Sequence, residues 1–167
     1  TLKNSPFSKI RMCIFPKDYI HNHNEPQYYP YQMDKNGSQN HYRFNPEFWD
    51  HLEKRILQLQ ELGIEADIIL LHPYDRWGYA KMRDDQDDFY IKYAVARLSA
   101  YRNVWWSLAN EFDFMDFKTM DDWHRIFRII YNEDPYHHLR SIHNGYVMYD
   151  HALPWVTHAS IQRTSFD

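Results

Sequence analysis

The sequence is poor in cysteine and glycine, and it has no long apolar run. Cys13 is the only cysteine among 167 residues, so no disulfide can form within the chain, which favours a cytosolic protein. With four glycines, no expected strand is followed by the glycine-rich turn of a dinucleotide-binding fold. The longest apolar run, Ile68 to Leu71, is far too short to cross a bilayer. These absences argue against a dinucleotide site of the Rossmann type and against a membrane-embedded protein.

The charge pattern excludes two further classes of partner. The net charge is −4, and the lysines and arginines are scattered along the chain. We therefore expect neither a nucleic acid nor an anionic membrane as partner. A composition of 44% hydrophobic and 25% charged residues predicts one globular domain over residues 1–167, and it leaves the oligomeric state open.

Aromatic residues are abundant, at 18% of the chain. They can belong to a large core with some surface tyrosines, or they can line a cleft whose rings stack on sugars. The eleven histidines favour a polar, hydrogen-bonding pocket in the second case. Composition alone does not decide between these interpretations.

Along the chain, apolar runs alternate with amphipathic segments. We expect strands at 9–15, 66–71, 104–109, 139–143 and 158–162, the last two with weaker signals. Helices are predicted from Pro46 to Leu62, over 88–101, and from Thr119 to Pro135. The segments 16–43 and 72–83 lack periodicity and are expected to be loops.

Strands and helices that alternate at this spacing predict an α/β fold with a parallel sheet, most simply a (β/α)₈ (TIM) barrel. In such barrels, the carboxyl ends of the strands and the loops after them carry the chemistry. The residues at these ends are Arg11 to Phe15, His72 to Asp75, Asn110 to Asp113, His143-Asn144 and Gln162-Arg163. Glu111 is the most informative of them, because a carboxylate is costly in a dry core but natural at an open barrel mouth. It can also be a carboxylate at a helix start or a surface ion-pair partner.

The segment Val104 to Glu111 (VWWSLANE) resembles the fourth strand of the large clan of retaining glycoside hydrolases with (β/α)₈ barrels. Phe7 to Arg11 resembles the second strand of that clan, and Pro46 to Trp77 resembles its second helix and third strand. The chain is most similar to bacterial glycosidases with little biochemical description. The match runs through nearly the whole chain as strands two to six.

This resemblance implies an incomplete barrel over 1–167 that lacks strands one, seven and eight. A retaining mechanism needs a second carboxylate about 5–5.5 Å from the first. In this clan the second carboxylate lies at the end of strand seven. The resemblance therefore predicts a glycosidase whose nucleophile lies outside this chain, and a fragment that is inactive by itself.

The resemblance assigns roles to three residues. Glu111 is implied as the general acid/base, and Asn110 as the residue that holds the sugar 2-hydroxyl. Arg11 is implied to support the catalytic carboxylate; the alternative is a structural ion pair inside the barrel. No metal or other cofactor is expected, and the substrate is a glycoside or oligosaccharide.

Four more residues near strand ends are candidates for substrate binding. His72 and His143 can donate hydrogen bonds in the cleft, or they can be satisfied core histidines. Asp75 and Trp77 lie in the loop after the third strand. Trp77 can stack on a sugar ring or can simply cover its loop.

Two other functions remain as alternatives. The first is a non-catalytic carbohydrate-binding protein on the same scaffold, because a fold alone does not fix a function. The second is a metal-dependent hydrolase, suggested by the stretch from His21 to Glu25 (HNHNE). No further ligand completes that set, so a solvated or substrate-contacting loop is the favoured interpretation of the stretch.

Overall fold

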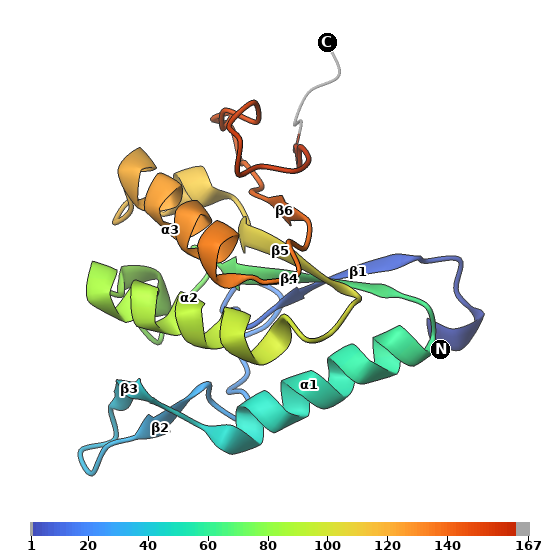
Figure 1. The fold of residues 1–167 in the computed structure, drawn as a ribbon. Helices are drawn as coiled ribbons and strands as arrows, with labels where there is room; N and C mark the ends of the chain where they lie inside the picture. The colour runs from blue at the N-terminus through green and yellow to red at the C-terminus, as the bar shows by residue number, and fades with distance from the viewer. Residues whose placement is uncertain (1, 163–167) are drawn as a thin grey trace.

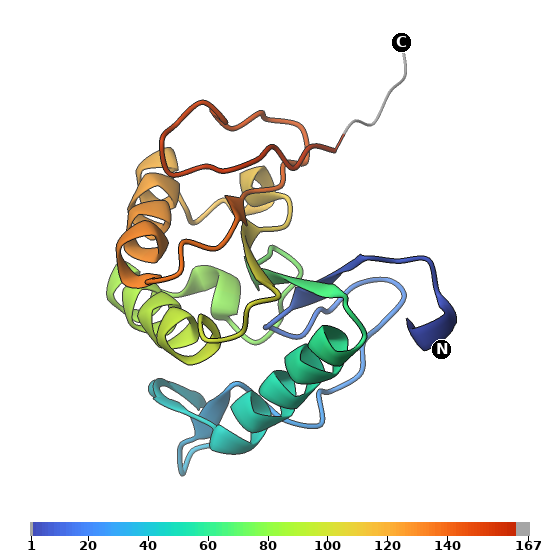
Figure 2. The ribbon, with the colours of Figure 1, turned by 45° about the vertical axis from the view of Figure 1, so that its right-hand side comes forward.

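The structure, a computed structural model that describes residues 2–162, contains a parallel sheet with three α-helices on one face (Figures 1 and 2). The sheet has the order β1-β4-β5-β6, and each neighbouring pair is parallel. The strands are β1 (Lys9–Cys13), β4 (Glu65–Leu71), β5 (Val104–Ala109) and β6 (Arg140–Ser141). The helices are α1 (Pro46–Glu61), α2 (Asp84–Leu98) and α3 (Met120–Glu133). The predicted alternation of strands and helices is therefore present.

Local signals in the sequence determine where two of the helices begin or end. The Asn45 side chain accepts a hydrogen bond from the Glu47 amide and caps α1. Gly63, after α1, has a φ of +70°, the left-handed conformation that favours glycine. Thr119 and Asp122 form the predicted capping box of α3. These caps satisfy backbone groups that the helices themselves leave unpaired.

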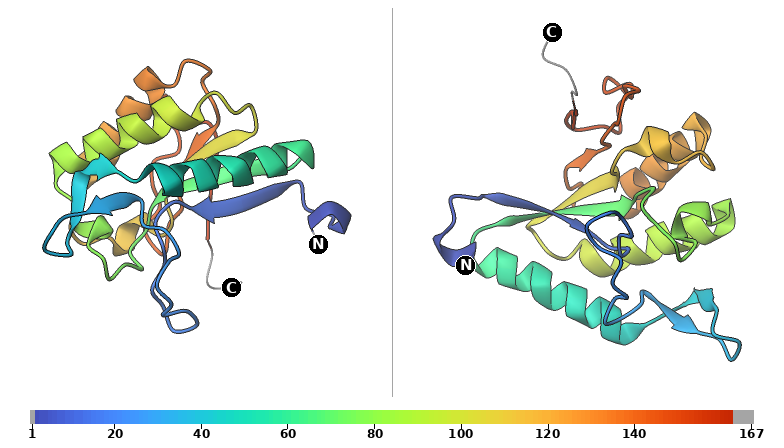
Figure 3. Two further views of the ribbon diagram at one scale, coloured as in Figure 1. Left: turned by 90° about the horizontal axis from the view of Figure 1, so that it is seen from below. Right: turned by 180° about the vertical axis from the view of Figure 1, so that it is seen from behind.

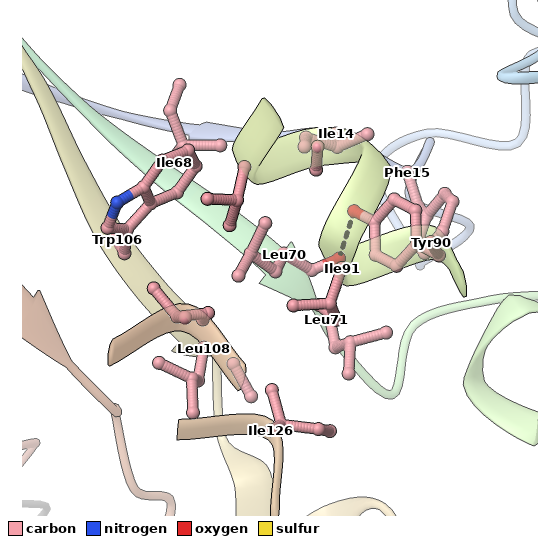
Figure 4. Packing of buried hydrophobic residues seen from close by; sticks show 14 of the residues in the cluster. Ile14, Phe15, Ile68, Leu70, Leu71, Tyr90, Ile91, Trp106, Leu108 and Ile126 are labelled. Carbon is pink, nitrogen blue, oxygen red and sulfur yellow. Dashed lines mark hydrogen bonds between the residues drawn. The ribbon is translucent and has the colours of Figure 1, made fainter. Parts of the chain in front are cut away.

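The core lies between the sheet and the helices (Figure 4). Ile68, Leu70 and Trp106 are fully buried there. The buried Tyr90 hydroxyl of α2 donates to the Leu70 carbonyl oxygen at 2.9 Å, which ties α2 to β4. Burial of one such large apolar side chain stabilises the fold by about 1.5–3 kcal/mol. Packing on this face holds the strand ends in fixed positions.

The opposite face of the sheet carries charged and polar side chains beside apolar ones. Arg11, Asp67 and Trp105 are in register on three neighbouring strands, so they share this face. Asp67 is buried, and its Oδ2 atom lies 3.1 Å from the Lys9 Nζ atom and 3.6 Å from the Arg11 Nε atom. A buried carboxylate needs such partners.

The segment 16–43 differs from the expected loop, because it contains a β-hairpin (Figure 3). Strands β2 (Tyr31–Met33) and β3 (Gln39–Phe44) are antiparallel. In the turn, the Asp34 amide donates to the Ser38 carbonyl oxygen and the Gly37 amide donates to the Asp34 carbonyl oxygen, and Gly37 has a φ of +80°. Phe44 stacks on Tyr93 of α2, with 3.7 Å between the ring centroids. The hairpin is thus packed on the domain by aromatic contacts.

Other predicted boundaries also differ, beginning with β1, which ends at Cys13 rather than at residue 15. Helix α2 begins four residues before the predicted 88 and ends at Leu98 rather than 101. The strand predicted at 139–143 is reduced to Arg140–Ser141. The segment 158–162 contributes one isolated parallel bridge, between His143 and Ser160, because it pairs with the irregular end of β6.

Three short 3₁₀ helices complete the described elements: η1 (Leu2–Asn4), η2 (Tyr79–Lys81) and η3 (Phe112–Phe114). Within residues 2–162, no helix has the length and apolar character needed to traverse a bilayer.

Candidate active site at the end of strand β5

Glu111 follows the last residues of β5 and has a φ of +51°, which is unusual for a residue with a side chain. The backbone around it is held from two sides. The Phe112 amide donates to the His143 carbonyl oxygen, and the Phe114 amide donates to the carbonyl oxygen of Glu111 itself. A strained backbone that its neighbours fix in this way is frequent at active sites.

Three side chains donate hydrogen bonds to the Glu111 carboxylate. The Tyr74 hydroxyl and the Asn110 Nδ2 atom both bind Oε2, the latter at 2.9 Å. The Gln162 Nε2 atom binds Oε1 at 3.1 Å. Tyr74 follows β4, Asn110 follows β5, and Gln162 lies in the segment beside β6. Side chains from three neighbouring strand ends therefore meet at this one carboxylate.

The Glu111 carboxylate lies beside an open pocket of about 290 Å³. The pocket is lined by Lys17 and Tyr19 from the loop after β1, Tyr74 from the loop after β4, and Asn110 and Glu111. Among the described residues that line it, Glu111 is the only acid. The side chain is therefore packed but accessible from solvent, as a group that transfers protons to a ligand must be.

Arg11 lies behind Asn110, and the predicted pair is brought together. The Arg11 Nη1 atom donates to the Asn110 Oδ1 atom, and its Nη2 atom donates to the Ser107 hydroxyl, both at 3.3 Å. Because Arg11 occupies Oδ1, the amide nitrogen of Asn110 is directed at Glu111. Arg11 also forms an ion pair with Asp67. The same side chain therefore makes both the structural ion pair and the contact with Asn110.

His143 contacts Glu111 through an intermediate. Its Nε2 atom lies 3.2 Å from the Gln162 Oε1 atom, and Nδ1 lies 3.2 Å from the Ser160 hydroxyl. The Gln162 amide then donates to Glu111. His143 therefore fixes which end of the Gln162 amide points to the carboxylate.

His72 and Asp75 make contacts within the protein. His72 is buried, and its Nε2 atom lies 3.0 Å from the Phe15 carbonyl oxygen. Burial lowers the pKa of His72 to about 4. The Asp75 carboxylate accepts the backbone amides of Trp77, Gly78 and Ala80 at 2.7–3.1 Å and so shapes the loop after β4.

Trp77 lies at a different pocket from Glu111. Its indole Nε1 atom donates to the Glu25 carboxylate at 2.9 Å. The Arg76 guanidinium lies over its ring, 4.8 Å from the centroid. Together with Glu25 it lines a pocket of about 400 Å³ beside the β2–β3 hairpin. Trp77 thus lies at the same end of the sheet as Glu111 but outside the Glu111 pocket.

The stretch from His21 to Glu25 forms contacts of a loop. The His23 Nδ1 atom lies 2.8 Å from the Asp18 carboxylate, and Glu25 accepts from Trp77 and Arg76. Across residues 2–162, no cluster of three or more histidine, cysteine, aspartate or glutamate side chains could hold a metal ion.

The sequence places Tyr74 and Gln162 at strand ends but assigns them no role. Their positions follow from the strand signals, whereas their contacts with Glu111 do not. Arg163, named beside Gln162, lies outside the described residues.

Comparison with known proteins places this geometry in a family. The family model described as "Apiosidase-like, catalytic domain" matches residues 4–165. A solved structure of a candidate glycoside hydrolase from Bacteroides vulgatus is 47% identical, has a TM-score of 0.92, and is matched over 96% of this chain and 34% of its own. No curated protein gives a significant match.

More distant structures show the fold alone. A glycoside hydrolase of family 5 from Bacteroides vulgatus is 14% identical, has a TM-score of 0.66, and is matched over 92% of this chain and 33% of its own. A further structure, described as a glycoside hydrolase, is 17% identical with a TM-score of 0.63, and is matched over 93% of this chain and 34% of its own. These matches confirm the predicted partial (β/α)₈ barrel. The chain spans about a third of the length of the structures it matches.

Proposed function

The chain belongs to the apiosidase-like catalytic domain family, and on this premise we propose that it supplies the acid/base half of a retaining glycoside hydrolase site. Glu111 is the proposed general acid/base. The observation that carries the proposal is the convergence of Tyr74, Asn110 and Gln162 on the Glu111 carboxylate beside an open pocket. The proposed substrate is a glycoside, and the family description makes apiosyl glycosides the first to test.

In the first step, Glu111 would protonate the leaving-group oxygen as the glycosidic bond breaks. In the second step, the Glu111 carboxylate would take a proton from the attacking water. Such a residue must be stable both with and without its proton. The amides of Asn110 and Gln162 donate to the carboxylate, while the Tyr74 hydroxyl can donate to the carboxylate or accept from the carboxylic acid.

Supporting residues would keep this geometry. Asn110 is proposed to hold the sugar 2-hydroxyl, with Arg11 fixing its amide. His143 is proposed to act through Gln162 rather than on the substrate directly. His72 and Asp75 are proposed to shape the cleft through Phe15 and the loop after β4. Pre-organised contacts of this kind reduce the reorganisation that the reaction requires.

A nucleophile must come from elsewhere. Retention requires a second carboxylate about 5–5.5 Å from the first, and no other described acid lines the Glu111 pocket. We therefore propose that residues 1–167 form one section of a barrel, without strands one, seven and eight, and that the nucleophile lies at the end of strand seven. By this proposal, the 167-residue chain does not hydrolyse glycosides by itself.

The test uses a barrel protein that contains this section and its strand seven. Aryl glycosides, beginning with an aryl apioside, are assayed with the wild type and the Glu111→Gln variant. We expect the second step to slow by about 10²–10⁴-fold and azide to restore turnover, because this anion attacks without a general base. Glu61→Gln, at the end of α1, is the control and should retain full activity.

A variant at Glu111 that keeps full turnover would contradict the assignment. Sugar binding without any turnover in the complete barrel would instead favour the non-catalytic carbohydrate-binding alternative.

A further inference from the structure

The pockets at Glu111 and at Trp77 share two loops in their walls. One loop follows β1 and supplies Lys17 and Tyr19 to the Glu111 pocket, and Glu25 and Tyr29 to the Trp77 pocket. The other follows β4 and supplies Tyr74 to the first pocket and Trp77 to the second. Because both loops leave the carboxyl ends of parallel strands, both pockets open at the same end of the sheet.

Arg76 joins the two pockets. Its Nη1 atom lies 3.4 Å from the Asp18 Oδ1 atom, and its Nη2 atom lies 2.6 Å from the Glu25 Oε1 atom. Asp18 stands between Lys17 and Tyr19, and its amide donates to the Tyr74 carbonyl oxygen at 3.0 Å. A single guanidinium therefore connects the wall of one pocket to the wall of the other.

The chemistry of the Trp77 pocket suits a polyhydroxylated ring. Its volume of about 400 Å³ lies within the usual range for small-ligand sites, which is about 300–1,000 Å³. Trp77 and Tyr29 offer aromatic surface, while Ser38 and Gln39 offer hydrogen-bonding groups. The Gln39 Oε1 atom accepts from the Tyr79 hydroxyl at 2.7 Å, so its amide nitrogen is left for donation.

The charge of the pocket selects against acidic ligands. Burial lowers the pKa of His41, so this side chain is neutral at pH 7. Hydrogen bonds from Tyr29 and Trp77, with the nearby Arg76, lower the pKa of Glu25, which is therefore ionised. Among the described residues that line the pocket, Glu25 is the only one charged at neutral pH. Arg76 is shared between Glu25 and Asp18, so it offers no free cation to the carboxylate of a uronic acid, whereas a neutral sugar needs none.

We propose that the Trp77 pocket binds a neutral sugar unit of the same oligosaccharide whose glycosidic bond is broken at Glu111. The substrate is then an oligosaccharide or a side chain of a polysaccharide, rather than a simple glycoside with a small leaving group. This inference rests on the proposed function for its choice of carbohydrate as the ligand. It adds a second binding site and a preference for chain length and charge.

Binding is tested in the 167-residue chain carrying Glu111→Gln, by nuclear magnetic resonance of the tryptophan indole N–H groups. The chain has six tryptophans, and the Trp77 signal is identified by its loss in Trp77→Phe. Cello-, xylo- and galacto-oligosaccharides of increasing length are titrated, in parallel with oligogalacturonides of the same lengths. We expect at least one neutral series to move the Trp77 signal saturably, and the acidic series to leave it in place.

Substitutions test whether the oligosaccharide binds at Trp77. Trp77→Ala should weaken the binding of the responding oligosaccharide about tenfold or more, whereas Trp77→Phe should retain part of the affinity. Tyr136→Ala removes an exposed ring that precedes β6, at the opposite end of the sheet, and should leave affinity unchanged. Glu25→Gln should reduce the discrimination against the acidic series.

The proposal is overturned if no neutral oligosaccharide moves the Trp77 signal, or if the acidic series binds more tightly. Its failure is distinct from failure of the proposed function. An inert Trp77 pocket together with hydrolysis that depends on Glu111 would reject the distal site alone. Saturable binding at Trp77 with turnover that ignores Glu111 would reject only the assigned acid/base.

Discussion

The Tyr74 hydroxyl and the Asn110 amide bind the same oxygen of Glu111, although Tyr74 and Glu111 lie 37 positions apart in the sequence. Tyr74 differs from the other two partners because a hydroxyl can reverse its hydrogen bond. Burial, followed by the bond to Glu111, raises the pKa of Tyr74 to about 12. The phenol therefore stays protonated at working pH and remains available as donor or acceptor.

Replacement of Tyr74 by phenylalanine should slow glycoside hydrolysis by the complete barrel about 10- to 100-fold, the value of one hydrogen bond to a charged group. The ring remains, so the pocket keeps its shape. Tyr19→Phe is the matched control, because Tyr19 lines the same pocket without a hydrogen bond to Glu111. Equal effects of the two variants on kcat would show that Tyr74 acts only as part of the pocket wall.

The sequence predicted the buried part of the fold well. Strands β4 and β5 are continuous apolar runs, and such runs have few alternatives to a buried parallel strand. The edge was harder to predict, because Arg140 and Ser141 give no apolar pattern and are ordered by neighbours such as Thr157. Helix α2 begins earlier than predicted. It starts after Arg83, whose amide donates to the Gln86 side chain, and arginine is not an expected cap.

The hairpin of β2 and β3 is not part of the predicted fold, although its turn contains the dipeptide Asn36-Gly37, a strong hairpin signal. The flanking strands are largely polar, so apolar periodicity does not indicate them. In the site, Asn110 and Glu111 could be named from one strand end. The contacts of Tyr74 and Gln162 with Glu111 could not, because they depend on how loops from distant strands meet.

The pair formed by Lys118 and Asp87 is buried, with 2.5 Å between the Lys118 Nζ and Asp87 Oδ2 atoms. Burial raises the pKa of Asp87 to about 6, although Lys118 opposes this shift. Asp87→Asn should lower the free energy of unfolding by about 3–5 kcal/mol, because it leaves a buried ammonium unpaired. The double variant Asp87→Asn/Lys118→Met should recover much of that loss in urea denaturation. If the loss in the double variant equals the sum of the losses in Asp87→Asn and Lys118→Met, the two charges do not interact.

Asp113 holds the chain after β6 in place. Its carboxylate accepts the amides of Gly145, Tyr146 and Val147 at 2.5–2.8 Å. Burial alone would raise the pKa of Asp113, but these three donors bring it below its ordinary value. Asp113→Ala should therefore increase hydrogen exchange at the three amides, while Asp116→Ala in the same loop should not. Unchanged protection in Asp113→Ala would mean that other contacts order this segment.

His72 should make the fold sensitive to mild acid. Its Nε2 atom donates to the Phe15 carbonyl oxygen, and its Nδ1 atom has no partner among the described residues, so protonation would place a buried charge without an acceptor. Its pKa is about 4 in the folded protein and about 6.5 when unfolded. The unfolded state therefore binds more protons between these values, and stability from His72 is complete above pH 6.5 and is lost as the pH falls.

From pH 7 to pH 5, the free energy of unfolding should decrease by about 2 kcal/mol through His72. Urea denaturation of the wild type and His72→Gln at both pH values isolates this effect, because groups that titrate in both proteins cancel. An equal pH dependence in the two proteins would mean that His72 can accept a proton without disturbing the fold.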